Sequence, residues 1–121
     1  MKTKSLLLMA ITALLFLASC KKNDPVLPQL VFTNSVTEGT ANASGEYTIT
    51  GHISSTVSLD KVVVTKEGQT TPFIIDESTA KNKNEYDFSY LITGITANTY
   101  IIIEVYDQNG GKIIQRFLIK K

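Results

Sequence analysis

The stretch Tyr100-Ile101-Ile102-Ile103-Glu104-Val105-Tyr106-Asp107, followed by Gln108-Asn109-Gly110-Gly111, decides how this chain folds. It is a run of β-branched and aromatic residues closed by a turn signal, which is typical of a strand. Successive side chains of a strand point to opposite faces, so Ile101, Ile103 and Val105 would face a core and Glu104 would face water. We therefore expect residues 100–107 to form a central strand.

Further β-prone segments flank this strand and are separated by turns and loops; they span residues 29–33, 45–53, 59–66, 71–75, 85–92 and 113–119. The Asn109-Gly110 pair predicts that the last segment forms an antiparallel hairpin with the central strand. Pro28 and Pro72 favour edge positions for the segments 29–33 and 71–75. Residues 34–44 and 76–84 are expected to be loops. Seven short strands without helical periodicity predict an all-β, antiparallel sandwich of two sheets.

Two of these segments alternate clearly between apolar and polar residues, as half-buried strands do. The inward positions would be Tyr47, Ile49, Gly51 and Ile53 in one segment and Tyr86, Phe88, Tyr90 and Ile92 in the other. A glycine at an inward strand position indicates a bulge or the close approach of a neighbouring side chain. We expect one of these two explanations to hold for Gly51.

The segment from Leu91 to Tyr100, continued to Gly110, resembles part of fibronectin type III and related bacterial Ig-like domains. In that family an apolar-Gly-apolar turn, here around Gly94, precedes a tyrosine that opens the next-to-last strand. The resemblance implies an Ig-like sandwich over residues 29–121. Tyr100 shares parity with Glu104, whereas the family's tyrosine faces inward. Either a bulge resets the phase near Ile101, or the tyrosine corner is absent.

The amino terminus has the features of an export signal. Lys2 and Lys4 precede an apolar run from Leu6 to Leu17, which is shorter than the roughly 20 residues that a membrane-spanning helix needs. Leu17-Ala18-Ser19-Cys20 resembles the lipobox of bacterial lipoproteins. The resemblance implies that residues 1–19 are cleaved and that Cys20 carries acyl chains, palmitate among them. The alternative is an ordinary signal peptide that contains a cysteine.

Residues 20–28 are expected to be the lipidated cysteine and a tether, stiffened by Pro25 and Pro28. Lys21-Lys22-Asn23-Asp24 after the cysteine is similar to the start of mature lipoproteins from Bacteroidetes-type bacteria. The resemblance implies an outer-membrane protein of the cell envelope, on the periplasmic side or at the cell surface. Lys21 in place of an aspartate argues against retention in the inner membrane.

Composition limits the possible functions. The formal charge is +1, and removal of residues 1–19, which carry Lys2 and Lys4, lowers it to about −1. No basic excess remains to attract nucleic acid. One cysteine excludes an intramolecular disulfide, and one histidine, His52, with one cysteine excludes a zinc site of the usual composition.

No nucleophile motif accompanies His52, which we expect to be a solvated surface residue on the polar parity of its strand. The neighbouring carboxylates Glu85 and Asp87, and likewise Asp76 and Glu77, are expected to be solvated charges. We predict no catalytic residues, no cofactor and no metal. The remaining alternative for a metal is a Ca²⁺ bound by Asp107 together with Asp60 or Asp76.

Tyr100, Ile102 and Tyr106 share the outward parity of the central strand and form the expected exposed apolar strip. Our leading hypothesis is a non-enzymatic, membrane-anchored lipoprotein whose Ig-like domain contacts a protein of a cell-envelope complex. The second hypothesis is a glycan-binding accessory module of an outer-membrane uptake system, which would use these tyrosines for stacking. A small hydrolase is the third.

Overall fold

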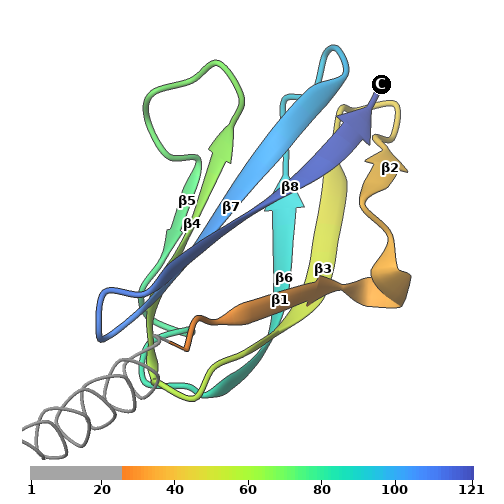
Figure 1. Cartoon of the computed structure of the whole chain (residues 1–121). Coiled ribbons are helices and arrows are strands. Elements are labelled where there is room, and N and C mark those ends of the chain that lie inside the picture. The colour runs from red at the N-terminus through yellow and green to blue at the C-terminus, as the bar shows by residue number, and fades with distance from the viewer. Residues whose placement is uncertain (1–25) are drawn as a thin grey trace, which may run out of the picture.

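The computed structural model describes residues 26–121, and the predicted leader 1–19, Cys20 and most of the tether lie outside the described residues. The regular secondary structure of the described chain is almost entirely β-strand (Figure 1). The elements are β1 (Gln29–Phe32), a 3₁₀ segment η1 (Thr33–Ser35), β2 (Glu38–Thr40), β3 (Tyr47–Ser54), β4 (Leu59–Lys66), β5 (Ile74–Asp76), β6 (Glu85–Ile92), β7 (Thr99–Asp107) and β8 (Lys112–Lys120).

The strands form two sheets that pack face to face. One has three strands in the order β1-β3-β6, and the other has five in the order β2-β8-β7-β4-β5. β7 is the middle strand of the larger sheet, as the sequence predicts. β1 and β5 lie at sheet edges, which confirms the expectation drawn from the two prolines. The eight strands of residues 26–121 enclose one hydrophobic core.

The expectation of seven strands, all antiparallel, differs from the structure, which has an eighth strand in the predicted loop 34–44. β2 pairs parallel to the end of β8, with Glu38 opposite Leu118. Residues 38–40 are Glu, Gly and Thr, and this composition does not favour a strand. The strand forms because the backbone of the chain returning from η1 meets the free edge of β8, with the Leu118 N–H donating to Thr37 O at 3.0 Å.

The predicted strand 71–75 is also displaced, because β5 begins at Ile74 and ends at Asp76. Pro72 has no N–H to donate, and the ladder to β4 starts only after Phe73, whose N–H donates to Val64 O at 2.7 Å. Asp76, assigned by sequence to a loop, is therefore a strand residue, and it is buried.

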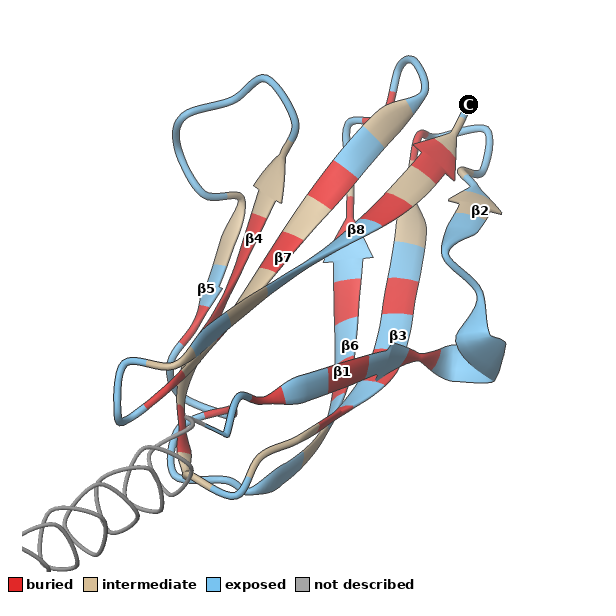
Figure 2. Ribbon diagram, in the orientation of Figure 1, coloured by how far each residue is buried: buried red, intermediate tan, exposed pale blue. Residues whose placement is uncertain are grey.

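The core lies between the two sheets and has the predicted alternation. Ile101, Ile103 and Val105 of β7 have no exposed surface, and buried and half-exposed positions alternate along that strand in Figure 2. Each such side chain stabilises the fold by about 1.5–3 kcal/mol relative to an exposed one. From the smaller sheet Ile49, Ile53 and further inward residues complete the core.

Gly51 on β3 illustrates how tightly the sheets pack. A Cβ atom at this position would lie 2.6 Å from Phe88 Cζ and 2.6 Å from Val31 O. The β3–β6 register is continuous, so of the two explanations for Gly51 the close approach is correct and the bulge is not. The Phe88 ring occupies the space and stacks on Tyr90 with 5.2 Å between ring centroids.

The β7–β8 connection confirms the predicted hairpin. Only Gly110 in the turn has a positive φ, of 83°, and the Asp107 N–H donates to Gly111 O at 2.9 Å. The pairing of β7 with β8 is unbroken from Thr99 to Tyr106, so no bulge resets the phase near Ile101. Tyr100 points outward, and the family's tyrosine corner is absent here. The irregularity in this sheet lies instead between Leu59 and Lys61 of β4.

Within residues 26–121 no helix has both the length and the apolar character needed to span a bilayer.

Candidate functional site

The candidate site is the outer face of the five-stranded sheet, formed mainly by β7 and its neighbours β4 and β8. We call it the β7 outer face. The β7 residues on it are Tyr100, Ile102, Glu104 and Tyr106, and the strand register places Leu118, Arg116, Ile114 and Lys112 of β8 opposite them, in that order. From β4, Lys61, Val63 and Thr65 complete the face. The structure therefore places the three predicted residues Tyr100, Ile102 and Tyr106 on one surface.

The apolar side chains of the β7 outer face are exposed unequally. Tyr100 is 43% exposed and Ile114 is 53% exposed, whereas Ile102 and Tyr106 are half-buried. Ile75 of β5, opposite Val63, extends the face and is 56% exposed. Sequence reasoning missed Ile114 and Ile75. The sequence predicts a strand over 113–119, but the β7–β8 register that brings Ile114 next to Glu104 depends on the length of the hairpin loop.

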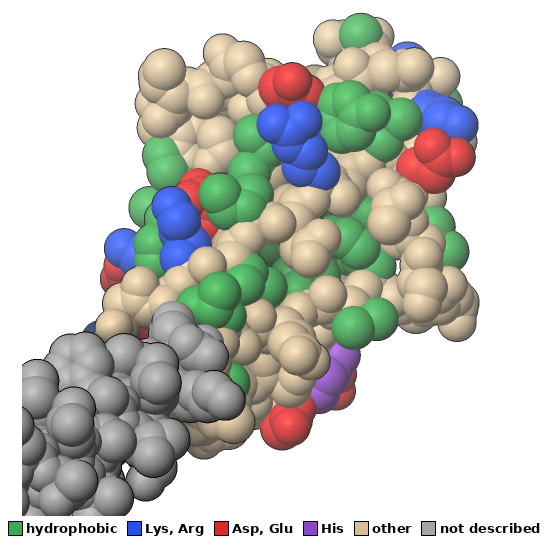
Figure 3. Space-filling model, in the orientation of Figure 1, with side chains coloured by type: hydrophobic (Ala, Val, Ile, Leu, Met, Phe, Trp, Pro, Cys, Tyr) green, Lys and Arg blue, Asp and Glu red, His purple; other side chains and the backbone are tan. Residues whose placement is uncertain are grey.

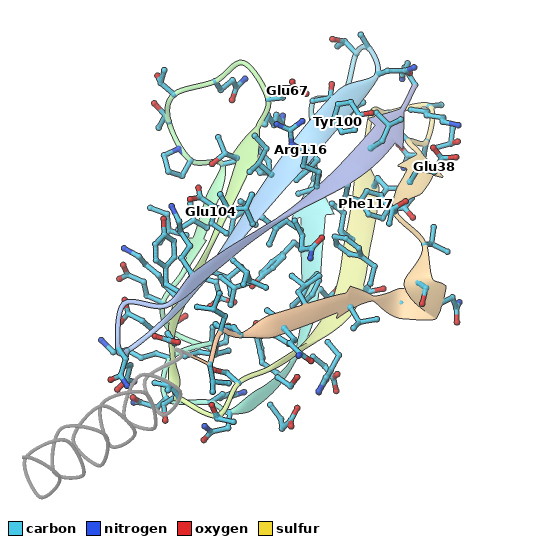
Figure 4. All side chains as sticks on the ribbon, viewed as in Figure 1. Glu38, Glu67, Tyr100, Glu104, Arg116 and Phe117 are labelled. Atoms are coloured by element: carbon cyan, nitrogen blue, oxygen red, sulfur yellow. The ribbon has the colours of Figure 1, made fainter. Side chains whose placement is uncertain are left out.

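Basic side chains are interspersed with these apolar residues. Lys61 Nζ and Lys112 Nζ lie 5.1 and 5.6 Å from the centroid of the Tyr106 ring, and Arg116 Cζ lies 6.0 Å from the centroid of Tyr100. Such cation–π contacts hold the cations over the rings. Figure 3 shows hydrophobic and basic side chains next to one another on the side of the molecule formed by β7 and β8, and Figure 4 shows Tyr100 and Arg116 as neighbours.

Glu104 is the acidic residue in the middle of the face, and its charge is largely compensated. Its Oε2 accepts a hydrogen bond from the Tyr106 hydroxyl at 2.9 Å and lies 3.5 Å from Lys112 Nζ. Partial burial, together with this carboxylate, raises the pKa of Tyr106. The β7 outer face thus combines exposed aliphatic groups, two tyrosines and basic groups, and of these the tyrosines and Arg116 are residue types that are enriched at protein interfaces.

His52 lies on the opposite side of the molecule, on the outer face of the three-stranded sheet. Its Nδ1 lies 2.6 Å from Asp87 Oδ1 and its Nε2 lies 2.5 Å from Glu85 Oε2. The hydrogen bonds to Asp87 and Glu85 raise the pKa of His52 above 6.5. The prediction of a surface histidine is confirmed. The side chains of Glu85 and Asp87 are 67% and 89% exposed, in line with the solvated charges expected there, and the β3–β6 register also brings them next to His52, which the sequence did not indicate.

The His52 cluster lacks the arrangement of a catalytic triad. Both ring nitrogens are engaged by carboxylates, so neither is directed at a serine hydroxyl. Within residues 26–121 no group of three or more His, Cys, Asp or Glu side chains is arranged to hold a metal ion. Three hollows on the described surface have volumes of about 190, 220 and 240 Å³. These volumes fall below the roughly 300–1,000 Å³ of small-molecule sites.

The carboxylates considered for Ca²⁺ have other partners in the structure. Asp107 Oδ1 accepts the N–H groups of Asn109 and Gly111 at 2.9 and 2.7 Å, inside the hairpin turn. Asp76 Oδ2 accepts the hydroxyls of Tyr86 and Tyr90 at 2.7 and 2.8 Å. Asp107 and Asp76 therefore serve the fold.

Asp76 joins the two sheets, because it ends β5 while both tyrosines belong to β6. Its Oδ1 also accepts the Thr79 hydroxyl at 2.6 Å and the Thr79 N–H at 3.1 Å. Burial raises the pKa of Asp76, and the hydrogen bonds from Thr79, Tyr86 and Tyr90 outweigh it, so that the net shift is downward. Burial, and then the adjacent Asp76 carboxylate, raise the pKa of Tyr90 well above 10.

Comparison with known proteins gives a likeness of fold. No protein-family model matches the chain, and no curated protein matches it. Among solved structures, the fibronectin(III)-like modules of Clostridium thermocellum CbhA superpose with a TM-score of 0.54 at 18% sequence identity. The match covers 79% of this chain and 47% of that one, so this chain corresponds to about half of the solved structure. Residues 26–121 therefore have the fold of an Ig-like, fibronectin type III-like β-sandwich.

Proposed function

We propose that this chain is a non-catalytic, lipid-anchored lipoprotein of the bacterial cell envelope, of the Bacteroidetes type, whose sandwich binds a protein of an envelope complex. Acyl chains on Cys20 hold it to the outer membrane, because two or more chains give stable attachment. The short tether to Pro28 then keeps the sandwich close to the membrane and presents its faces to a partner.

The observation that carries the protein-contact proposal is the composition of the β7 outer face. Tyr100, Ile114 and Ile75 are large, apolar and more than 40% exposed. They lie on a rigid sheet next to Arg116 and two lysines. Tyrosine and arginine are enriched where proteins bind each other, and lysine is depleted. We assign the partner contact to the Tyr100–Arg116–Ile114 part of the face.

The second candidate is a glycan-binding accessory module of an uptake system. Tyr100 and Tyr106 are aromatic and accessible enough to touch a sugar. Stacking on a sugar needs an open ring face, however, and basic groups stand within 6.0 Å of both ring centroids. We therefore rank protein contact above glycan binding.

The anchor is tested by mass spectrometry of the protein purified from membranes. We expect the first residue to be Cys20 with acyl chains attached, and a Cys20→Ala variant to leave the membrane fraction. An unmodified Cys20 with residues 1–19 still in place would refute the lipoprotein proposal.

The contact is tested with a photo-crosslinking amino acid at Ile114 or at Tyr100 in the native membrane. Both positions should give an adduct with the same envelope protein, and Arg116→Glu should weaken both. A matched crosslinker at Thr48, which is exposed on the other sheet, should not give that adduct. Equal adducts at Thr48 and Ile114 would contradict a specific contact on the β7 outer face. Binding of an oligosaccharide that Tyr100→Ala abolishes would favour the glycan alternative.

A further inference from the structure

The free edge of β6 is a second candidate surface, and it belongs to the other sheet. In an antiparallel ladder the residues of a strand alternate between those whose backbone N–H and C=O face the neighbouring strand and those whose groups face away. The Ser55 N–H donates to Asn84 O at 2.8 Å, one step beyond the Ser54–Glu85 pair. The even-numbered residues of β6 therefore bond to β3. The backbone groups of Glu85, Asp87, Ser89 and Leu91 face outward.

These outward groups have no strand beside them in the part of the chain that the structure describes. β6 ends the three-stranded sheet, with β3 as its ladder neighbour (Figure 1). Among the turn and loop hydrogen bonds of residues 26–121, none involves the backbone of these four residues. The edge thus offers four N–H and four C=O groups, spaced as a ladder partner requires.

The other edges of the two sheets are protected, whereas that of β6 is open. β2 and β5 have three residues each and β1 has four, and the part of β8 beyond β2 carries Lys112 and Arg116. Short edges and basic side chains on an edge prevent the pairing of foreign strands. β6 has eight residues, with no Pro, Gly, Lys or Arg and with a continuous register to β3.

The exposed side chains along β6 define what would fit beside them. Glu85 and Asp87 each contact His52 through one carboxylate oxygen, and their side chains remain 67% and 89% exposed. Ser89 is exposed, and Leu91 is 52% exposed. Opposite charges directly across a ladder are favourable, by about 0.2–1 kcal/mol per pair. On the inner side of the edge, Tyr86 and Tyr90 reach across to Asp76. Side chains of a bound segment that point to this inner side therefore have to be small.

We propose that β6 binds an extended segment of a partner protein by strand addition. The segment carries Lys or Arg opposite Glu85 and Asp87, an apolar residue opposite Leu91, and small residues at the alternate positions. Backbone hydrogen bonds to the four outward residues hold the segment, and the side chains on the outer face select it. This goes beyond the function proposed above, because it uses the opposite sheet and does not require the lipid anchor.

The test uses residues 21–121 and a blocked eight-residue peptide with lysine opposite Glu85 and Asp87, valine opposite Leu91 and threonine elsewhere. Titration followed by amide NMR should shift the signals of residues 85, 87, 89 and 91 most, with saturation in the millimolar range. A peptide with glutamate in place of both lysines should bind at least tenfold more weakly. Shifts that centre on any other surface would overturn the proposal.

Two variants at one position separate backbone from side chain. Ser89→Pro removes an outward N–H that the β3 ladder does not use and should abolish binding, whereas Ser89→Ala keeps the N–H and should bind normally. Should Ser89→Pro lose its dispersed spectrum, Asp87→Lys provides a second test, because it should prefer the glutamate peptide. Equal binding by folded Ser89→Pro, or no change of peptide preference in Asp87→Lys, would refute strand addition. Dimers that form through β6 without peptide would show that the occupant is a second copy and would overturn the proposed basic partner.

Discussion

Replacement of Asp76 by alanine removes the acceptor that joins the two sheets. Asp76 is 8% exposed and Tyr90 is 7% exposed, so water cannot readily replace the lost partner. In the variant the Tyr86 hydroxyl still has a hydrogen-bond partner, Thr79 Oγ1 at 2.9 Å. The Tyr90 hydroxyl, in contrast, has Asp76 as its only hydrogen-bond partner among the described residues. A buried donor left without a partner costs about 1–3 kcal/mol, and each lost bond to a charged group about 1.5–3 kcal/mol.

We expect Asp76→Ala to lower the free energy of unfolding by about 3 kcal/mol, since several of these terms overlap in one network. For a domain of this size that corresponds to a fall in Tm of roughly 15 °C. Urea unfolding followed by circular dichroism measures the free energy directly. Asp76→Asn keeps one carbonyl acceptor and should lose about half as much.

A double-mutant cycle with Tyr90→Phe tests the reasoning. Tyr90→Phe should cost about 1.5–3 kcal/mol in the native background, where it removes a hydrogen bond to a charged group, and should stabilise the Asp76→Ala background by about 1–3 kcal/mol, where it removes an unpaired buried hydroxyl. Equal effects of Tyr90→Phe in both backgrounds would refute the coupling, and a loss below 1 kcal/mol for Asp76→Ala would refute the magnitude.

The Asp76 and Tyr90 pair also predicts how stability depends on pH. The pKa of Asp76 is lower in the folded state than its ordinary 3.8. The stability that Asp76 contributes to the fold is therefore present above pH 3.8 and is lost as the pH falls below that value. The pKa of Tyr90 is raised from 10, so its contribution is complete below pH 10 and is lost as the pH rises further. Tyr90→Phe should reduce this alkaline loss, and the part that remains comes from Tyr86 and Tyr106, whose pKa values are also raised.

Three further predictions follow from other sites. The pKa of His52, read from its ring signals by NMR, should lie above 6.5 and should fall toward that value in the double variant Glu85→Gln/Asp87→Asn. The stability that the cluster contributes is then present below pH 6.5 and is lost as the pH rises through the raised pKa. A pKa of His52 that does not change in the double variant would contradict the observed contacts. Gly51→Ala should destabilise the fold by about 1–3 kcal/mol in urea unfolding because its Cβ meets Val31 O and Phe88, whereas Thr48→Ala on the same strand should have little effect. Asp107→Ala should cost about 1–2 kcal/mol by releasing two turn N–H groups, and Asp107→Asn, which keeps an acceptor, should cost less; equal costs would argue against the turn hydrogen bonds.

Much of the fold could be predicted because alternation and turn chemistry are local properties of the sequence. The bounds of β4 and β6 match the predicted segments 59–66 and 85–92, and the inward residues of β7 were identified by parity alone. β2 was missed because its strand character comes from the edge of β8, about 80 residues away in sequence. A segment of Glu, Gly and Thr carries no local signal for such pairing.

Side-chain clusters between strands could not be predicted for a related reason, because they depend on register. With three loop residues between Asp107 and Gly111, Ile114 lies opposite Glu104 and Arg116 lies opposite Ile102. A two-residue loop centred on Asn109 and Gly110 would shift the register by one residue and turn the other set of β8 side chains outward. The same holds for His52, whose two carboxylate neighbours follow from the alignment of β3 with β6.

Single substitutions affect partner binding at the two candidate surfaces differently, so mutagenesis can show which surface a partner uses. The β7 outer face would bind a partner through side chains, so Arg116→Glu or Tyr100→Ala changes it while every backbone hydrogen bond of β7 and β8 remains. The β6 edge would bind a partner through the backbone, so side-chain truncation at Ser89 should leave binding intact and only a proline removes its donor. A partner lost with Arg116→Glu but retained with Ser89→Pro must therefore contact the larger sheet. A partner with the reverse pattern must add a strand to the smaller one.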